Sequence, residues 1–140
     1  MTKETKTEML RRLFTDNNLA EDDVHVMKMG GKSIPIITRT GIDKIVARHN
    51  ITLDYIIENL TQDNKHVVIR CIAKMGDKNC VTFGESSPTN TKQAYPVAMA
   101  EKRAKARAVL TLAGLYEHGV MSEDESDDFK SKKALPHELG

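Results

Sequence analysis

Apolar and polar side chains alternate most regularly between residues 51 and 83. A period of two is typical of strands that bury one face. Turn residues at 62–65 and 76–79 divide this stretch into three segments. The pattern predicts a three-stranded antiparallel meander whose polar face carries Arg70 and Lys74, and helices must cover its apolar face. The apolar set is Ile51, Leu53, Tyr55, Ile57, Val67, Ile69, Cys71, Ala73 and Met75.

The residues before the meander alternate between helical and extended patterns. Apolar positions at helical spacing predict an amphipathic helix over residues 2–15. Two short alternating runs around Gly30 and Gly31 predict a hairpin from 24 to 38, with Pro35 confined to an edge strand. A second helix is expected over 41–49, with Thr40 as its N-cap.

The strongest helical signal extends from residue 95 to residue 115. Small or apolar residues occupy two opposite faces, so the helix can lie closely on a sheet, and basic residues occupy the flanks between them. These bases are Lys102, Arg103, Lys105 and Arg107. The predicted fold class is therefore α+β: an N-terminal helix or arm at 1–20, a core at 21–118 in which hairpin, short helix and meander pack against the long helix, and a tail at 119–140.

Length and composition exclude several function classes. A chain of 140 residues with 39% apolar residues can form one core but not a multidomain enzyme. No apolar run reaches the roughly 20 residues of a membrane span and the first residues lack a secretory signal, so we expect a cytoplasmic protein without a membrane partner. Two cysteines, Cys71 and Cys80, are too few for a disulfide scaffold and more typical of small core residues.

The chain shows no catalytic or metal-binding pattern. Its five histidines are scattered, and no Gly-x-Ser-x-Gly elbow is present. The Gly31-Lys32-Ser33 sequence ends like a phosphate-binding loop, but Val26 replaces the required glycine and a strand follows where a helix is needed. We expect no enzymatic activity, no cofactor and no metal.

Charge is distributed unevenly along the chain. Residues 122–140 contain six acids and three bases, whereas residues 1–121 contain 14 acids and 18 bases. A basic body suits a polyanionic partner, and the acidic tail, expected to be disordered, could recruit a protein.

The bases of the meander and the long helix are the candidate nucleic-acid-binding residues, because together they could line one groove for a phosphate backbone. Tyr55 and Phe83 could stack bases, although Tyr55 belongs to the apolar set. The alternative is a solvated surface, with Arg70 and Lys74 paired across strands to Asp54 and Glu58. The candidates are Lys65, Arg70, Lys74, Lys78, Lys102, Arg103, Lys105 and Arg107.

The order hairpin, helix, meander, long helix, with residues 29–34 (MGGKSI), 40–45 (TGIDKI) and 98–110 (AMAEKRAKARAVL), resembles phage-type single-strand annealing proteins. These are recombinases of the Erf and RecT kind and their eukaryotic relative, the Rad fifty-two repair protein. The resemblance implies a homo-oligomeric ring or filament that acts in DNA recombination and repair in a bacterial or phage-infected cell. It would bind single-stranded DNA in a basic groove and anneal complementary strands without ATP. An exposed edge at 34–38 could pair with the next subunit.

Two other functions fit parts of the pattern. A helix, three antiparallel strands and an Ala-rich basic helix also describe a double-stranded-RNA-binding domain, although a long loop at 86–94 replaces the Lys-rich entry to its last helix. The third possibility is an oligomeric scaffold or adaptor whose acidic tail recruits a partner.

Overall fold

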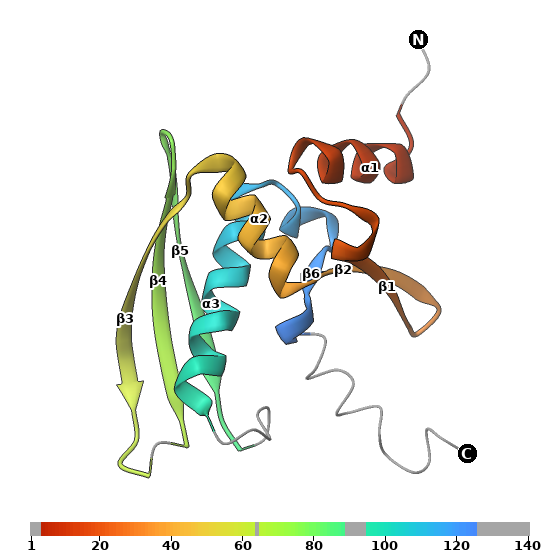
Figure 1. The fold of residues 1–140 in the computed structure, drawn as a ribbon. Coiled ribbons are helices and arrows are strands. Elements are labelled where there is room, and N and C mark those ends of the chain that lie inside the picture. The colour runs from red at the N-terminus through yellow and green to blue at the C-terminus, as the bar shows by residue number, and fades with distance from the viewer. Residues whose placement is uncertain (1–3, 64, 89–94, 126–140) are drawn as a thin grey trace, which may run out of the picture.

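The structure, a computed structural model, describes residues 4–63, 65–88 and 95–125. It is a mixed α+β fold with two three-stranded sheets, one ordered β3-β4-β5 and the other β1-β2-β6. Helix α3 lies along the first sheet, and α2 lies beside α3 on the same side (Figure 1). The predicted fold class is confirmed.

The meander consists of β3 (Thr52–Leu60), β4 (Val67–Met75) and β5 (Lys78–Ser86). Both pairings are antiparallel, with Cys71 opposite Tyr55 on one side and Thr82 on the other. Along β4, buried residues alternate with more exposed ones from Val67 to Ala73. The period-two prediction is confirmed along β4, because only one face of this sheet is covered by a helix. On β3 it is wrong at Ile57, which is 54% exposed beside a register shift between Ile57 and Asn59.

Helix α3 (Pro96–Leu112) covers that face and is the most buried element. Ala100, Ala104 and Ala108 are fully buried, and the Thr82 hydroxyl donates to the Ala104 carbonyl oxygen at 2.7 Å. The small side chains let the helix axis lie close to the strands. The helix ends earlier than the predicted residue 115, because the chain turns at Gly114, whose φ of 76° is left-handed, and the Leu115 N–H returns to the Leu110 carbonyl oxygen.

The N-terminal elements follow the predicted order. Helix α1 (Lys6–Asp16) is capped by Thr5 and precedes a 3-10 turn, η1 (Glu21–Asp23). Strands β1 (Val24–Met29) and β2 (Lys32–Ile37) form the predicted hairpin, with Gly30 and Gly31 at positive φ in its turn.

Helix α2 (Arg39–His49) begins two residues before the predicted start. The predicted N-cap, Thr40, is wrong: the hydroxyl of Thr38 accepts the Gly41 N–H at 3.0 Å. Both threonines could cap a helix, and Thr38 does so because β2 ends one residue before it.

The residues after α3 depart most from expectation. After η2 (Tyr116–His118), strand β6 (Met121–Ser122) pairs in parallel with Ile36 and Ile37 of β2. The predicted disorder of the tail at 119–140 is therefore wrong for residues 119–125, where Val120, Ser122 and Asp124 are buried; residues 126–140 lie outside the described ranges. The expected free edge at 34–38 is also partly occupied, since β2 lies between β1 and β6, although Pro35 stays outside the β6 pairing.

Within the described ranges, no helix is long and apolar enough to cross a membrane.

Candidate nucleic-acid interface

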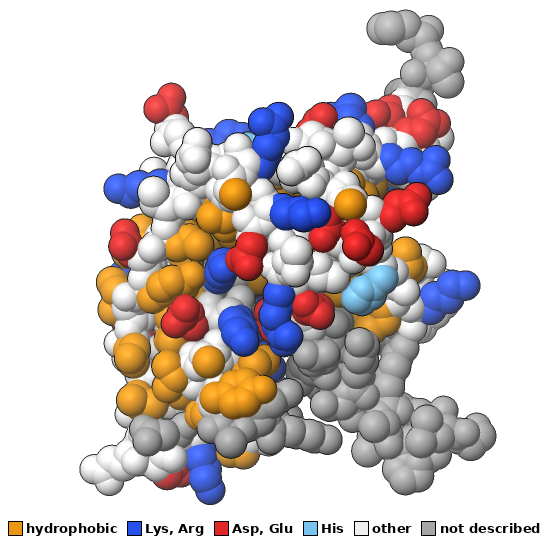
Figure 2. Space-filling model, viewed as in Figure 1, with side chains coloured by type: hydrophobic (Ala, Val, Ile, Leu, Met, Phe, Trp, Pro, Cys, Tyr) orange, Lys and Arg blue, Asp and Glu red, His pale blue; other side chains and the backbone are white. Residues whose placement is uncertain are grey.

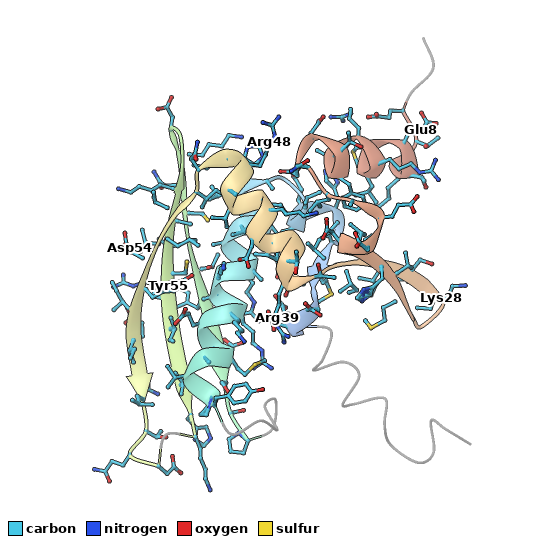
Figure 3. All side chains as sticks on the ribbon, viewed as in Figure 1. Glu8, Lys28, Arg39, Arg48, Asp54 and Tyr55 are labelled. Atoms are coloured by element: carbon cyan, nitrogen blue, oxygen red, sulfur yellow. The ribbon has the colours of Figure 1, made fainter. Side chains whose placement is uncertain are left out.

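The eight predicted cations do not line one groove. Arg70 and Lys74 alternate with Cys71 and Ala73, which are buried beneath α3, so both cations lie on the opposite face of the sheet. Arg70 Nε lies 2.7 Å from Glu58 Oε1. The alternative of cross-strand pairing is thus confirmed for Arg70 with Glu58. Figure 3 shows the same division on β3, where Asp54 points away from the helices and Tyr55 toward them.

Lys65 and Lys78 lie at opposite ends of the sheet. Lys65 precedes β4 and Lys78 begins β5 after the β4–β5 turn. The nine residues of β4 separate them, which at about 3.4 Å per residue corresponds to roughly 30 Å. These two lysines therefore cannot contribute to a compact phosphate site in one copy of the chain.

Arg103 and Arg107 bind the protein's own backbone. Arg103 is only 4% exposed, and its Nη1 donates to the Glu85 carbonyl oxygen at 2.9 Å. Arg107 Nη1 donates to the Phe83 carbonyl oxygen at 2.5 Å. β5 is an edge strand of its sheet, so no neighbouring strand donates backbone hydrogen bonds along its outer edge, where the two arginines bind. Both arginines thus complete the sheet edge, a role that the sequence pattern did not reveal.

Arg107 also lies between two carboxylates. Its Nε is 3.1 Å from Glu125 Oε1 and its Nη2 is 3.5 Å from Glu85 Oε1. Burial alone would lower the pKa of Arg107, but the two carboxylates outweigh it and raise that pKa above its ordinary value. Arg107 therefore stays charged and well paired.

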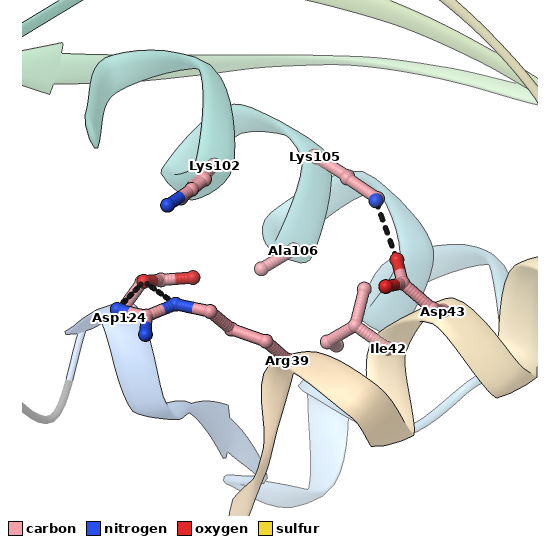
Figure 4. Close-up of a pocket in the computed structure, with 7 residues that line it drawn as sticks. All are labelled: Arg39, Ile42, Asp43, Lys102, Lys105, Ala106 and Asp124. Atoms are coloured by element: carbon pink, nitrogen blue, oxygen red, sulfur yellow. Dashed lines mark hydrogen bonds and ion pairs between the residues drawn. The ribbon is translucent and has the colours of Figure 1, made fainter. Parts of the chain in front are cut away.

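The remaining two predicted cations, Lys102 and Lys105, face a cleft between α2 and α3 (Figure 4). The cleft encloses about 110 Å³ and also exposes Arg39, the first residue of α2. Lys105 Nζ is 2.6 Å from Asp43 Oδ1, while the ion pairs between described residues include none for Lys102. Figure 2 shows Lys and Arg side chains gathered near the middle of this face, with acidic side chains between them.

Arg39 was missed by the sequence analysis. It lies 63 residues before Lys102, outside the stretch from Lys65 to Arg107 that contains the eight predicted cations. Only the contact between α2 and α3 brings it beside the lysines.

An acidic segment closes one side of the cleft. Glu123 Oε1 accepts the Arg39 backbone N–H at 2.5 Å, and Asp124 Oδ1 accepts from Arg39 Nε at 2.8 Å and lies 2.7 Å from Nη2. Asp124 is only 3% exposed. Residues expected to belong to a free tail are thus held against the cations.

Across the described ranges, no three His, Cys, Asp or Glu side chains gather closely enough to hold a metal ion. Burial raises the pKa of the Cys71 thiol to about 11 and also raises the pKa of the Tyr55 hydroxyl. Both residues therefore stay neutral at physiological pH, as core residues do. Phe83, in contrast, is 47% exposed on the outer face of the sheet.

Comparisons with protein-family models, curated proteins and solved structures found no significant match to this chain. The fold and the site define it as an α+β domain with a cationic cleft between two helices.

Proposed function

We propose that this protein binds single-stranded DNA at the α2–α3 cleft and anneals complementary strands without ATP, in recombination or repair. The observation that carries the proposal is the convergence of Arg39, Lys102 and Lys105, from two different helices, on one solvent-open cleft. Cations on a rigid surface neutralise phosphates along a strand without reading its sequence. The order of elements, which resembles that of single-strand annealing proteins, supports the same function.

The chemistry of annealing suits such a site. Pairing two complementary strands forms no covalent bond; it requires that phosphate repulsion be screened while the base edges stay accessible. A protein that holds the backbone through Lys and Arg meets both requirements. Because single cleft contacts are weak, we also propose that several copies assemble along one strand, so that multivalency supplies the affinity.

Two complementary oligonucleotides, one carrying a fluorophore and the other a quencher, test the annealing function. We expect the purified protein to accelerate duplex formation without nucleotide or divalent metal. A rate equal to that of protein-free strands would refute annealing. Mass measurement with and without oligonucleotide tests assembly: a monomer in both conditions would refute assembly along DNA.

A titration with duplex RNA separates the proposed function from the first alternative. The segment α2–β3–β4–β5–α3 has the element order of a double-stranded-RNA-binding domain, but the first basic residue of α3 is Lys102, nearly two turns after Pro96. We expect single-stranded DNA to be preferred; preference for duplex RNA would reverse the ranking. Binding to neither polymer would favour a scaffold or adaptor.

A further inference from the structure

The acidic segment formed by Glu123, Asp124 and Glu125 contacts one cation that lines the cleft, Arg39, and one cation outside the cleft lining, Arg107. Glu123 and Asp124 bind Arg39 at the start of α2, and Glu125 binds Arg107 on α3. Carboxylates favour the N-terminal end of a helix and the guanidinium fork for the same reasons that phosphates do. Glu123 and Asp124 thus present anions at Arg39, where the proposed function requires DNA phosphates, and Glu125 attaches the same segment to α3.

We propose that this acidic segment is a built-in competitor that occupies the phosphate-binding cleft until single-stranded DNA displaces it. The inference rests on the proposed function and specifies its regulation. With the segment in place, Asp124 neutralises Arg39 and Asp43 neutralises Lys105. When the segment leaves, Arg39 loses its contacts with Glu123 and Asp124, and the local charge beside Lys102 becomes more positive.

The strand pairing that leads into the segment is short. Among the described residues, it consists of the two-residue contact of Met121 and Ser122 with β2. The Ser122 hydroxyl is buried without a hydrogen-bond partner in the described part of the chain, which costs free energy in the docked state. Val120, just before the segment, is fully buried and can serve as the anchor at which the chain opens.

The docked segment lowers the apparent affinity for DNA. The apparent affinity equals the affinity of the open cleft multiplied by the fraction of molecules in which the cleft is open. Neutralising the segment should remove this competition. We therefore compare the wild type with the triple variant Glu123→Gln, Asp124→Asn, Glu125→Gln in the full chain. We expect the dissociation constant for a thirty-residue oligothymidine to fall by about fivefold.

A matched control removes the same charge elsewhere. Glu21→Gln, Asp54→Asn and Asp77→Asn change three exposed acids, none of which forms an ion pair with another described residue. The long-range effect of three lost negative charges should be similar in both variants, so only competition at the cleft distinguishes them. Equal affinity of the two variants would overturn the inference and leave the proposed function standing. Absence of DNA binding by all three proteins would overturn both.

Hydrogen exchange on the wild type gives a second measurement that does not depend on variant folding. Adding the oligothymidine should increase exchange at residues 121–125 several-fold, because their amides lose β2 and the cleft. Unchanged or slower exchange in a protein that binds the oligothymidine would show that the segment stays docked, and would overturn the inference.

Discussion

Arg103 donates a hydrogen bond from Nη1 to the backbone carbonyl oxygen of Glu85, at 2.9 Å. Arg107, one turn later on α3, makes the same kind of bond to Phe83, two residues earlier on β5. Four helical residues rise about 6 Å and two strand residues about 6.8 Å, so the two spacings match. The basic helix therefore uses two of its cations to complete a sheet edge and leaves two for the cleft.

This division predicts that Arg103→Gln destabilises the protein. The substitution removes a charged donor that is itself buried from the Glu85 carbonyl oxygen, which should lower the free energy of unfolding by about 2 kcal/mol. Urea unfolding measures the change. Lys102→Gln, next to it on the same helix but less buried, is the control and should change stability by less than about 0.5 kcal/mol. Equal losses would contradict the structural role of Arg103.

The same division predicts which cations bind DNA. Lys102→Gln with Lys105→Gln should weaken single-stranded DNA binding about tenfold and reduce the salt slope by about 0.7 for each lost phosphate contact. Arg70→Gln with Lys74→Gln removes the same charge from the other face of the sheet and should change affinity about twofold or less. Fluorescence anisotropy at several salt concentrations measures both. A larger effect of the second pair would place the DNA on the outer face, near Phe83.

Gly84 should tolerate no side chain. A Cβ atom at this position would lie 2.0 Å from the Ala100 carbonyl oxygen and 2.5 Å from the Ala104 nitrogen. Both are backbone atoms of α3, so relief requires moving the helix off the sheet. We expect Gly84→Ala to cost more than about 3 kcal/mol, measured by thermal unfolding.

A turn glycine provides the comparison for Gly84. Gly119→Ala meets no atom within 4 Å but forces alanine to a φ of 81°. It should cost only about 1 kcal/mol. A Gly84→Ala variant as stable as Gly119→Ala would mean that α3 does not lie this close to β5.

Asp23 should make stability depend on pH. Its carboxylate accepts from Lys44 Nζ at 2.6 Å and from the Ala20 N–H at 2.8 Å, and these bonds, with that of Lys44 the stronger, lower its pKa. A lowered folded pKa gives stability that is complete above the unfolded value of about 3.9 and is lost as pH falls through the folded value. Because Lys44 is partly exposed, we expect Asp23→Asn to cost only about 1 kcal/mol at pH 7.

The difference between wild type and Asp23→Asn should begin to shrink below about pH 4, where the carboxyl of the unfolded wild type takes up a proton, and should vanish below the lowered folded pKa. Urea unfolding at pH 7, 5 and 3 measures it. A difference that persists at pH 3 would indicate that packing, and not charge, accounts for the effect.

Local patterns predicted the elements of the fold well. The alternation from Val67 to Ala73 placed β4 correctly, and the small residues of the long helix predicted its close packing on the sheet. Turn and cap positions were less certain because two residues of the same type compete, as Thr38 and Thr40 do before α2. The acidic residues after Met121 were mistaken for a free tail because their partner, Arg39, lies more than 80 residues earlier.

The sequence by itself determined which face of β4 is buried, since burial follows from a period of two within one strand. It also determined that bases gather in the body and acids near the end. Only the tertiary structure decided what each charge does. The direction in which Lys102 or Arg103 points depends on how α3 is rotated about its axis against the sheet. Which residues lie next to Arg39 depends on contacts between segments that are distant in the sequence. Such contacts leave no periodic signal in the chain, because each is made once.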